Sequence, residues 1–268
     1  MSIELASLAE NAPEAAPALI DARAAFDHSI WNRLLHEYVD DQGLVAYQRL
    51  QEHDRDALYS YLQQMATADP AAWKETERLA FWINAYNSMI VAAVLEGQSA
   101  ESLLGRGKIF KFWKFPIAGK ERTLDEVEHE ILRKEFAEPR IHFAIVCASR
   151  SCPRLRTEAY SADELEAQLD DQARRFINDP SRNELDMNHS LLRLSKIFDW
   201  FRSDFEREGT LLEFLARYVE TPPLRLWLEK NPPRVEIQYL DYDWTLNAQP
   251  EQRPREQKRP VIREGEPR

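Results

Sequence analysis

Apolar residues recur at helical spacing in the first hundred residues of the chain. Every fourth residue from Phe26 to Tyr38 is apolar, which predicts an amphipathic helix. A second helix is predicted over residues 54–65. Between residues 79 and 95 apolar side chains occupy every side of a helix rather than one stripe. Such a pattern is typical of a buried helix, so we expect this segment at the centre of the core.

The later part of the chain mixes helix and strand patterns. Aromatic residues alternate between residues 110 and 124, around a turn at residues 118–120, and predict a hairpin. Residues 141–147 are apolar on both faces and predict a central strand. The other predicted elements are helices capped by Thr123 and by Ser161, the second ending near Asn178, a hairpin at 185–194, helices at 197–205 and 211–218, and a strand at 235–239. Helices first and dispersed strands later predict an α+β fold, mostly helical with a small, mainly antiparallel sheet.

The two ends differ in composition from the middle. Residues 1–22 are rich in alanine and acids and predict a flexible lead-in, whereas residues 248–268 are rich in proline and charge and predict a disordered tail. Residues 23–247 are then a single α+β domain. The first residues lack the basic start and apolar run of a signal peptide, and we expect no membrane span and a cytoplasmic location.

Charge and glycine content exclude several classes of function. The chain has 35 basic and 46 acidic residues, a net charge of -11, which argues against broad binding of nucleic acid or anionic membranes but leaves a local basic patch open. Its 7 glycines never fall into a dinucleotide or Walker spacing, so we expect no nucleotide cofactor of those types, and indeed no cofactor. Two cysteines cannot build a disulfide framework, which favours a reducing compartment.

Both cysteines lie in one short window where the predicted strand ends. His142 lies at the start of that strand, and alternation places it on the face opposite to Cys147. Cys152 lies in the following loop, which can curl towards His142. A thiolate nucleophile is one interpretation, and a small buried Cys147 with a Cys152 packed in a turn, or a disulfide between the two, are the others. The remaining polar residues of this loop are candidates for binding a substrate: Ser149, Arg150 and Ser151.

The predicted buried helix carries amides, and a later segment carries an acid among aromatic residues. Asn84 and Asn87 share one helical stripe with Glu77, and buried amides require hydrogen-bond partners. These partners are either loop backbone or a substrate or histidine that the amide orients. Asp199 is a helix N-terminal acid or a second group that orients a histidine. Further candidate contacts to a substrate are Glu77, Tyr86 and Trp200. The histidines form no ligand spacing, so we expect no metal site.

Several motifs together resemble one bacterial and plant family, catalogued as domain of unknown function 547. The matching runs are GLVAY (43–47), AFWINAYNS (80–88), LDEVEHEILR (124–133), HFAIVCASRSCPRL (142–155), SKIFDWFRSDF (195–205) and YLDYDWTLN (239–247). The resemblance implies a single domain and raises His129 to an alternative base. The order of buried helix, histidine segment and acid segment is similar to the papain and transglutaminase layout. The chain departs from it with Asn84 and Asn87 where such enzymes carry cysteine.

Two functional hypotheses follow from these residues. The first is a cysteine-dependent hydrolase or acyl transferase, with Cys152 or Cys147 as nucleophile and His142 or His129 as base. The orienting group is then a buried amide, Glu77 or Asp199. The second is a binding module without turnover for an unidentified small molecule or peptide, with an aromatic cleft formed by Trp82, Trp113, Trp200 or Trp244. Thiol redox chemistry fits the cysteine spacing least well. The sequence leaves substrate and oligomeric state open.

Overall fold

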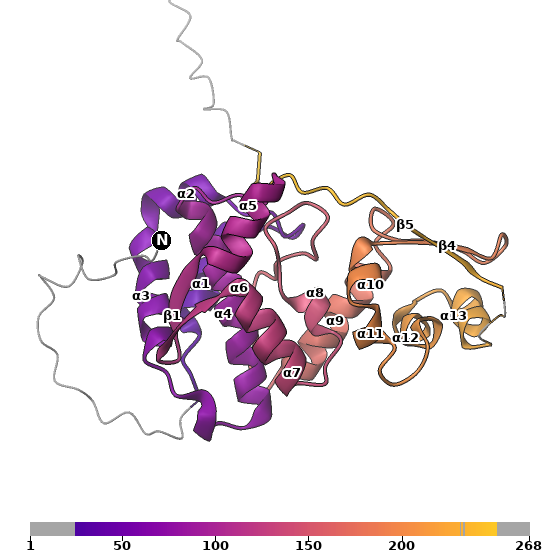
Figure 1. Cartoon of the computed structure of the whole chain (residues 1–268), viewed down its shortest axis with the longest axis horizontal. Helices are drawn as coiled ribbons and strands as arrows, with labels where there is room; N and C mark the ends of the chain where they lie inside the picture. Colours follow the sequence, from indigo (N-terminus) through magenta and orange to yellow (C-terminus); the bar gives the residue numbers. More distant parts are fainter. Residues whose placement is uncertain (1–24, 231, 233, 251–268) are drawn as a thin grey trace, which may run out of the picture.

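The computed structural model describes residues 25–230, 232 and 234–250 (Figure 1). The helices are α1 (Ser29–Tyr38), α2 (Tyr47–His53), α3 (Arg55–Ala66), α4 (Glu75–Leu95), α5 (Leu103–Gly107), α6 (Leu124–Glu126), α7 (Arg133–Glu135), α8 (Ile141–Ala144), α9 (Leu165–Ile177), α10 (Lys196–Trp200), α11 (Arg202–Phe205), α12 (Leu211–Tyr218) and α13 (Pro222–Glu229). The 3-10 turn is η2 (Pro70–Ala72), and the π-helical turns are η3 (Lys108–Phe112) and η4 (Val127–Leu132). The strands are β1 (Lys114–Ile117), β2 (Lys120–Thr123), β3 (Glu184–Asp186), β4 (Leu191–Leu194) and β5 (Glu236–Tyr239).

Helix α4 is the centre of the N-terminal half. Every residue from Leu79 to Ala93 is buried, which confirms the prediction of a helix that is apolar on all sides. Helices α1 and α3 and the β1–β2 hairpin pack around it (Figure 1). By length and composition alone α4 is apolar enough to cross a membrane, but 83% of its apolar window is buried inside the protein. That burial is the environment of a core helix.

The hairpin has its predicted turn but is shorter than predicted, because residues 110–112 belong to the π-helical turn η3 and pairing starts at Lys114. The helix that follows the hairpin begins as its residues predict. Ala118 and Gly119 both have positive φ, 50° and 74°, the backbone of a two-residue hairpin turn. The side chain of Thr123 accepts a hydrogen bond from the Glu126 amide, and the Glu126 carboxylate accepts one from the Thr123 amide. This reciprocal cap starts α6 at the predicted residue.

The C-terminal half has a second core and the remaining sheet. Strand β4 pairs antiparallel with β3 and parallel with β5, which confirms the predicted hairpin and the last predicted strand. Helices α9 and α12 pack against each other. The second core is rich in stacked and tilted phenylalanine rings, contributed by Phe143, Phe176, Phe198, Phe205 and Phe214. The chain is therefore an α+β fold with a small sheet in each half.

The predicted strand over residues 141–147 is wrong. Ile141–Ala144 form the single helical turn α8, and an extended run without a strand partner leads from there to Cys147. Short apolar runs do not distinguish a buried helical turn from a buried strand, because both hide every side chain. The predicted cap at Ser161 is also wrong, since α9 begins only at Leu165 and the Ser161 amide donates to Gln168 Oε1.

A closing segment, residues 240–249, returns from the C-terminal sheet to the N-terminal half (Figure 1). Its Leu246 forms an antiparallel bridge with Ser149, and Ala248 forms a parallel bridge with Val45. The Gln249 amide donates to the Val45 carbonyl. The first residues of the predicted tail are thus paired with the domain, while the rest of that tail and the predicted lead-in over 1–22 lie outside the described residues.

Candidate functional site

A cavity of about 380 Å³ lies where the two halves meet. Its walls are formed by the α5–η3 helix, the α6–η4 helix, the segment from His142 to Pro153, and α10 with the closing segment, and α4 contributes Tyr86. Its lining residues are Tyr86, Leu103, Arg106, Gly107, Phe110, Lys111, Asp125, Glu128, His129, His142, Ile145, Val146, Cys147, Cys152, Pro153, Ile197, Trp200, Phe201, Tyr242 and Trp244. Cys147 and Cys152 therefore share one cavity with His129 and His142, which reach it from separate elements.

The Cys147 sulfur is surrounded by hydrogen-bonding groups. Its Sγ lies 3.0 Å from Ser149 Oγ and 3.2 Å from the Tyr242 hydroxyl, and its own backbone amide donates to Cys152 Sγ at 2.8 Å. Burial opposes ionisation of Cys147, but hydrogen bonds from Cys152, Ser149 and Tyr242 outweigh it and lower the pKa of this thiol. Burial and the neighbouring Cys147 thiolate raise the pKa of Cys152. Cys147 is therefore the thiol that ionises first.

The chain turns sharply directly after Cys147. Ala148 has a φ of 58°, in the left-handed region that an alanine rarely adopts. This turn brings Cys152 back to the Cys147 amide and allows the closing segment to pair with Ala148 and Ser149. Strained backbone of this kind persists only where the surrounding structure holds it. Here the strained residue directly follows Cys147, the candidate nucleophile.

His142 forms a buried pair with an acid that the sequence did not single out. Its Nε2 lies 2.8 Å from Asp204 Oδ2, and its ring stacks on Phe201 with the centroids 3.8 Å apart. Arg133 donates to the same Asp204 carboxylate through Nε and Nη2. Burial lowers the pKa of His142 to about 4 despite the nearby carboxylate. The ring is therefore neutral at pH 7, with its proton on Nε2 and its lone pair on the unpartnered, buried Nδ1.

Two further titratable groups lie in the cavity wall formed by η4. Burial raises the pKa of Glu128 to about 7, and the Tyr86 hydroxyl donates to Glu128 Oε2 at 3.2 Å. His129 is only half-buried, and Arg133 donates to its Nδ1 at 3.1 Å. Burial also lowers the pKa of His129. Glu128 can therefore carry or release a proton close to neutral pH, a property that catalytic acids and bases share.

The cysteines and the histidines are not joined directly. Within the described chain, neither Sγ forms a hydrogen bond with the imidazole of His129 or His142. The expectation that His142 and Cys147 face apart along a strand does not apply, because α8 replaces the strand and both residues reach the cavity. The space between them is the cavity itself, which a substrate could fill.

Buried amides hold the Cys147 segment in place. The Asn87 side chain donates to the Ala144 carbonyl at 3.0 Å and accepts from the Val146 amide at 3.0 Å. It therefore forms the hydrogen bonds that a neighbouring strand would otherwise supply to this extended run. On the other side of the loop, Arg182 donates to the carbonyls of Arg150 and Cys152. Asn87 therefore positions the segment before Cys147 through its backbone.

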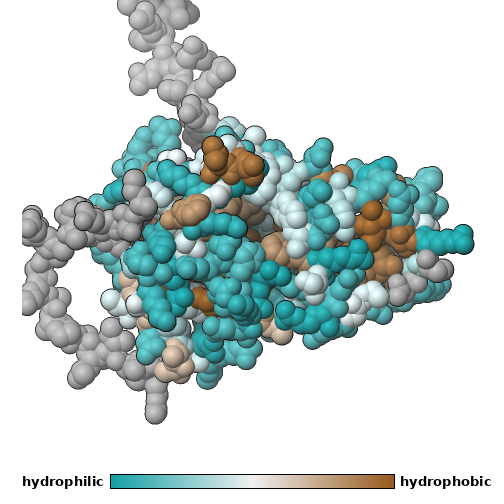
Figure 2. Space-filling model, in the orientation of Figure 1, coloured by the Kyte–Doolittle hydropathy of each residue, from teal (hydrophilic) through white to brown (hydrophobic). Residues whose placement is uncertain are grey.

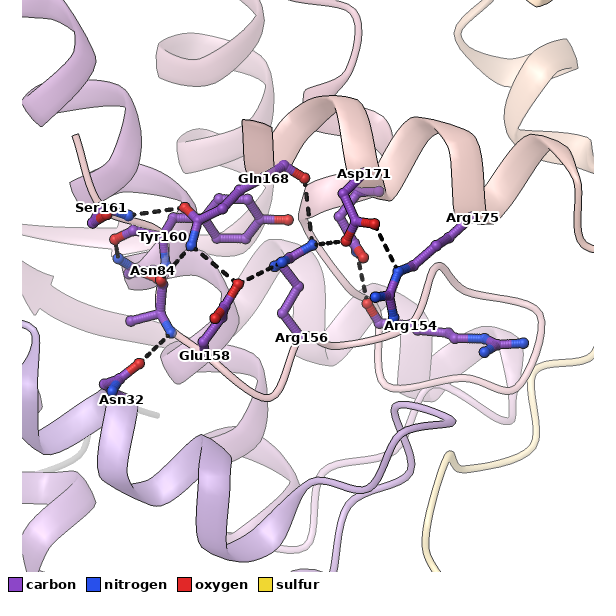
Figure 3. A network of polar contacts seen from close by, with 12 residues as sticks. Asn32, Asn84, Arg154, Arg156, Glu158, Tyr160, Ser161, Gln168, Asp171 and Arg175 are labelled. Atoms are coloured by element: carbon purple, nitrogen blue, oxygen red, sulfur yellow. Dashed lines mark hydrogen bonds and ion pairs between the residues drawn. The ribbon is translucent and has the colours of Figure 1, made fainter. Parts of the chain in front are cut away.

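Asn84 anchors the loop that follows the cysteines. Its amide donates to the Tyr160 carbonyl and its carbonyl accepts from the Tyr160 amide (Figure 3). Gln168 of α9 binds the same loop through the Ala159 carbonyl and the Ser161 amide, and ion pairs of Arg156 continue the network. Both buried asparagines thus have loop backbone as their partners, the first of the two alternatives drawn from the sequence.

Several residues proposed from the sequence lie outside the cavity lining. Glu77 caps the start of α4 by accepting from the Lys74 amide. Asp199 pairs with Lys196 at 3.6 Å. The Arg150 side chain reaches the Ala248 carbonyl, and Ser151 Oγ accepts from the Asp243 amide. Trp82 and Trp113 are buried in the N-terminal core, whereas Trp200 and Trp244 line the cavity.

Three side chains of the candidate site were not predicted from the sequence. Asp204, Glu128 and Tyr242 each lie inside a motif run that carries the family resemblance, and that was the only signal for them. Asp204 follows Asp199 by five residues, so the acid-bearing segment was recognised and the wrong acid chosen. Tyr242 comes from a part of the chain almost a hundred residues after Cys147, which no local pattern connects.

An aromatic group forms the outer edge of the cavity. Tyr242 lies with its ring centroid 4.9 Å from that of Trp200 and 4.6 Å from that of Trp244, and Arg106 stacks its guanidinium over Trp244 at 4.4 Å. Among the described residues, no group of three or more His, Cys, Asp or Glu side chains lies close enough together to hold a metal ion. The cavity thus offers apolar contact and hydrogen bonds to whatever occupies it.

Comparison with known proteins gives a match to a family model over part of the chain. No curated protein and no solved structure matches the chain. Three of the six motif runs, at 80–88, 124–133 and 142–155, lie inside the matched residues. The runs at 43–47, 195–205 and 239–247 lie outside them. Residues 70–177, which carry α4, Glu128, His142 and both cysteines, match the family model described as "Protein of unknown function, DUF547", and over this span the chain resembles that family.

Proposed function

We propose that the protein is a thiol-dependent acyl transferase or hydrolase with Cys147 as its nucleophile. The observation that carries this proposal is the cavity in which Cys147, with Ser149 and Tyr242 at its sulfur, faces the same space as His142 and Glu128. A thiolate held by hydroxyl donors is the reactive form of cysteine. Free thiols are expected to persist in a reducing compartment, which fits a cytoplasmic location.

The proposed reaction has two halves. The Cys147 thiolate attacks the carbonyl carbon of an ester, thioester or amide, the leaving group takes up a proton, and an acyl thioester forms on Cys147. Water or an acceptor then attacks that thioester, which releases the acyl product and restores the thiol. Glu128 and His142 are the two buried groups in the cavity that can donate and accept these protons. Asp204 acts as a positioning residue, because it fixes the tautomer of His142.

Alkylation of the two thiols across a range of pH tests the nucleophile. Iodoacetamide labelling followed by mass spectrometry should show Cys147 reacting faster than free cysteine at pH 7, and Cys152 reacting slowly. Tyr242→Phe removes one hydrogen bond to the thiolate, so the pH midpoint of Cys147 labelling should rise by about one unit. Tyr218→Phe, on α12 and outside the cavity lining, serves as the matched control and should leave the midpoint unchanged. Equal labelling of Cys147 and free cysteine would falsify the activated thiol.

Binding without turnover is the second candidate. The aromatic edge formed by Trp200, Tyr242 and Trp244, and the absence of a sulfur–imidazole hydrogen bond in the described chain, favour it. Hydrolysis of p-nitrophenyl acyl esters separates the two candidates. The catalytic proposal expects turnover by the wild type and its loss in Cys147→Ser. Equal rates for the two proteins, with retained binding of an apolar dye in the cavity, would favour the binding module.

A further inference from the structure

The helix formed by α5 and η3 has two different faces. Leu103, Arg106 and Phe110 recur at helical spacing and line the cavity. On the outward side, Leu104 is 88% exposed and Phe112 is 68% exposed. Figure 2 shows a hydrophobic patch on the surface above α5. One helix thus separates the cavity from an apolar area that faces solvent.

Exposed large apolar side chains are concentrated at this place. The described chain has six: Leu103, Leu104, Phe112, Met187, Trp200 and Leu226. Three of them belong to the α5–η3 helix, and Trp200 lines the cavity beside it. Removing the side chains of Leu104 and Phe112 from water would lower the free energy. A cluster of exposed apolar side chains marks a site of interaction with a membrane or another protein.

The charge of the same segment is opposite to that of the whole chain. Residues 103–114, here named the basic helix segment, comprise α5, η3, Trp113 and the first residue of β1. They contain Arg106, Lys108, Lys111 and Lys114 and no acidic residue, although the net charge of the chain is -11. Lys108 and Lys114 are exposed and have no carboxylate partner within the described residues, while Lys111 lies 3.9 Å from Asp125. The segment therefore combines free positive charge with exposed leucine and phenylalanine.

We propose that the outer face of the basic helix segment docks on an anionic lipid membrane. Helices that lie in a membrane surface carry lysine or arginine beside leucine and phenylalanine, and each basic residue adds attraction to anionic headgroups. Leu104 and Phe112 enter the headgroup region, and Lys108 and Lys114 contact lipid phosphates. This surface does not depend on the proposed thiol chemistry. Its position places the cavity next to the lipid, separated by a single helix.

Sedimentation with lipid vesicles tests the proposal. The full chain should sediment with vesicles of phosphatidylcholine mixed with phosphatidylglycerol, not with phosphatidylcholine alone, and added salt should weaken binding. Leu104→Glu/Phe112→Glu should lower the affinity at least about tenfold, and Lys108→Glu/Lys114→Glu should do the same. Alkylation of Cys147 should be unchanged in a folded variant, which separates loss of docking from loss of structure.

Matched substitutions elsewhere provide the controls. Leu226→Glu changes another exposed leucine, 57% exposed on α13, and Lys120→Glu/Lys230→Glu reverses two exposed lysines outside the segment. Both control proteins should bind the anionic vesicles as the wild type does. A wild-type chain that stays in the supernatant with every vesicle overturns the proposal and leaves the face to a protein partner. Equal loss of binding in the controls also overturns it, because the attraction would then not belong to this segment.

Discussion

His142 shows how one buried side chain fixes its own protonation. The Asp204 carboxylate binds Nε2 and by itself would favour the charged imidazolium. Burial against Phe201 and Phe205 costs more, so the neutral ring is the stable form. Arg133 neutralises much of the Asp204 charge and shifts the balance in the same direction. A neutral histidine that donates its Nε2 proton to an acid carries its lone pair on Nδ1, which is the form that a general base requires.

The low pKa of His142 predicts how stability changes with pH. The unfolded chain binds a proton at His142 below about pH 6.5, whereas the folded chain does not bind it until about pH 4. The contribution of His142 is therefore complete above pH 6.5 and is lost as the pH falls towards 4. Between pH 7 and pH 5 the loss is roughly 2 kcal/mol. His142→Gln, which can still donate to Asp204, should remove this dependence.

Urea unfolding of the wild type and of His142→Gln at pH 7 and at pH 5 measures this loss in the free energy of unfolding. Glu128 has the opposite effect, because its raised pKa lets the folded chain bind a proton between about pH 7 and its unfolded value. For this reason the difference between the two proteins is compared, not the slope of either one. A difference in free energy that stays constant from pH 7 to pH 5 would contradict the assignment.

At the scale of the elements, the sequence predicts correctly those helices and strands whose residues follow a single repeating pattern. Helix α4 is apolar on every side, and the β1–β2 hairpin has a turn that its residues specify, so both formed as expected. Residues 141–147 were predicted wrongly because their structure depends on Asn87, which reaches them from a different element. Helices α2 and α13 were missed because they span only 7 and 8 residues, fewer than the roughly 11 over which a helical period is read from a sequence.

The two buried asparagines of α4 allow a matched comparison. Asn87→Ala leaves the Ala144 carbonyl and the Val146 amide without partners, and Asn84→Ala does the same to both backbone groups of Tyr160. Each substitution should lower the free energy of unfolding by about 2–5 kcal/mol, measured by urea titration. Only Asn87→Ala should also change the alkylation rate of Cys147. Equal disturbance of the thiol by both variants would show that Asn87 has no special role.

At the scale of the whole molecule, the candidate site exists because two cores and a returning segment meet. Each core follows from the apolar pattern of its own half, whereas Asp204 reaches His142, and Tyr242 reaches the cavity, only after the chain has folded back. Contacts over such separations leave no local signal, which is why the cysteines, Ser149 and His142 were found from the sequence and their distant partners Asp204 and Tyr242 were not. The closing segment therefore contributes both to the stability of the domain and to the environment of Cys147.

Asn247 is the residue through which this segment can be tested. Its side chain accepts from the buried Tyr47 hydroxyl at 2.8 Å and donates to the Gly43 carbonyl at 3.3 Å, across about two hundred residues of chain. Asn247→Ala leaves both groups unpaired and should lower the free energy of unfolding by roughly 2–4 kcal/mol. The backbone amide of Asn247, which the substitution keeps, donates to the Ala148 carbonyl. Because this contact ties the closing segment to the residue after Cys147, loosening it should move Tyr242 and raise the pH midpoint of Cys147 alkylation.

The matched control for Asn247→Ala is Asn188→Ala, at an exposed hairpin position whose side chain makes no hydrogen bond within the described chain. It should change stability by no more than about 0.5 kcal/mol and leave the thiol unaffected. Urea unfolding and alkylation of both variants give the answer. If Asn247→Ala lowers stability while Cys147 labels as in the wild type, the segment only holds the two halves together. If both properties change together, the segment that closes the fold also sets the chemistry of the thiol.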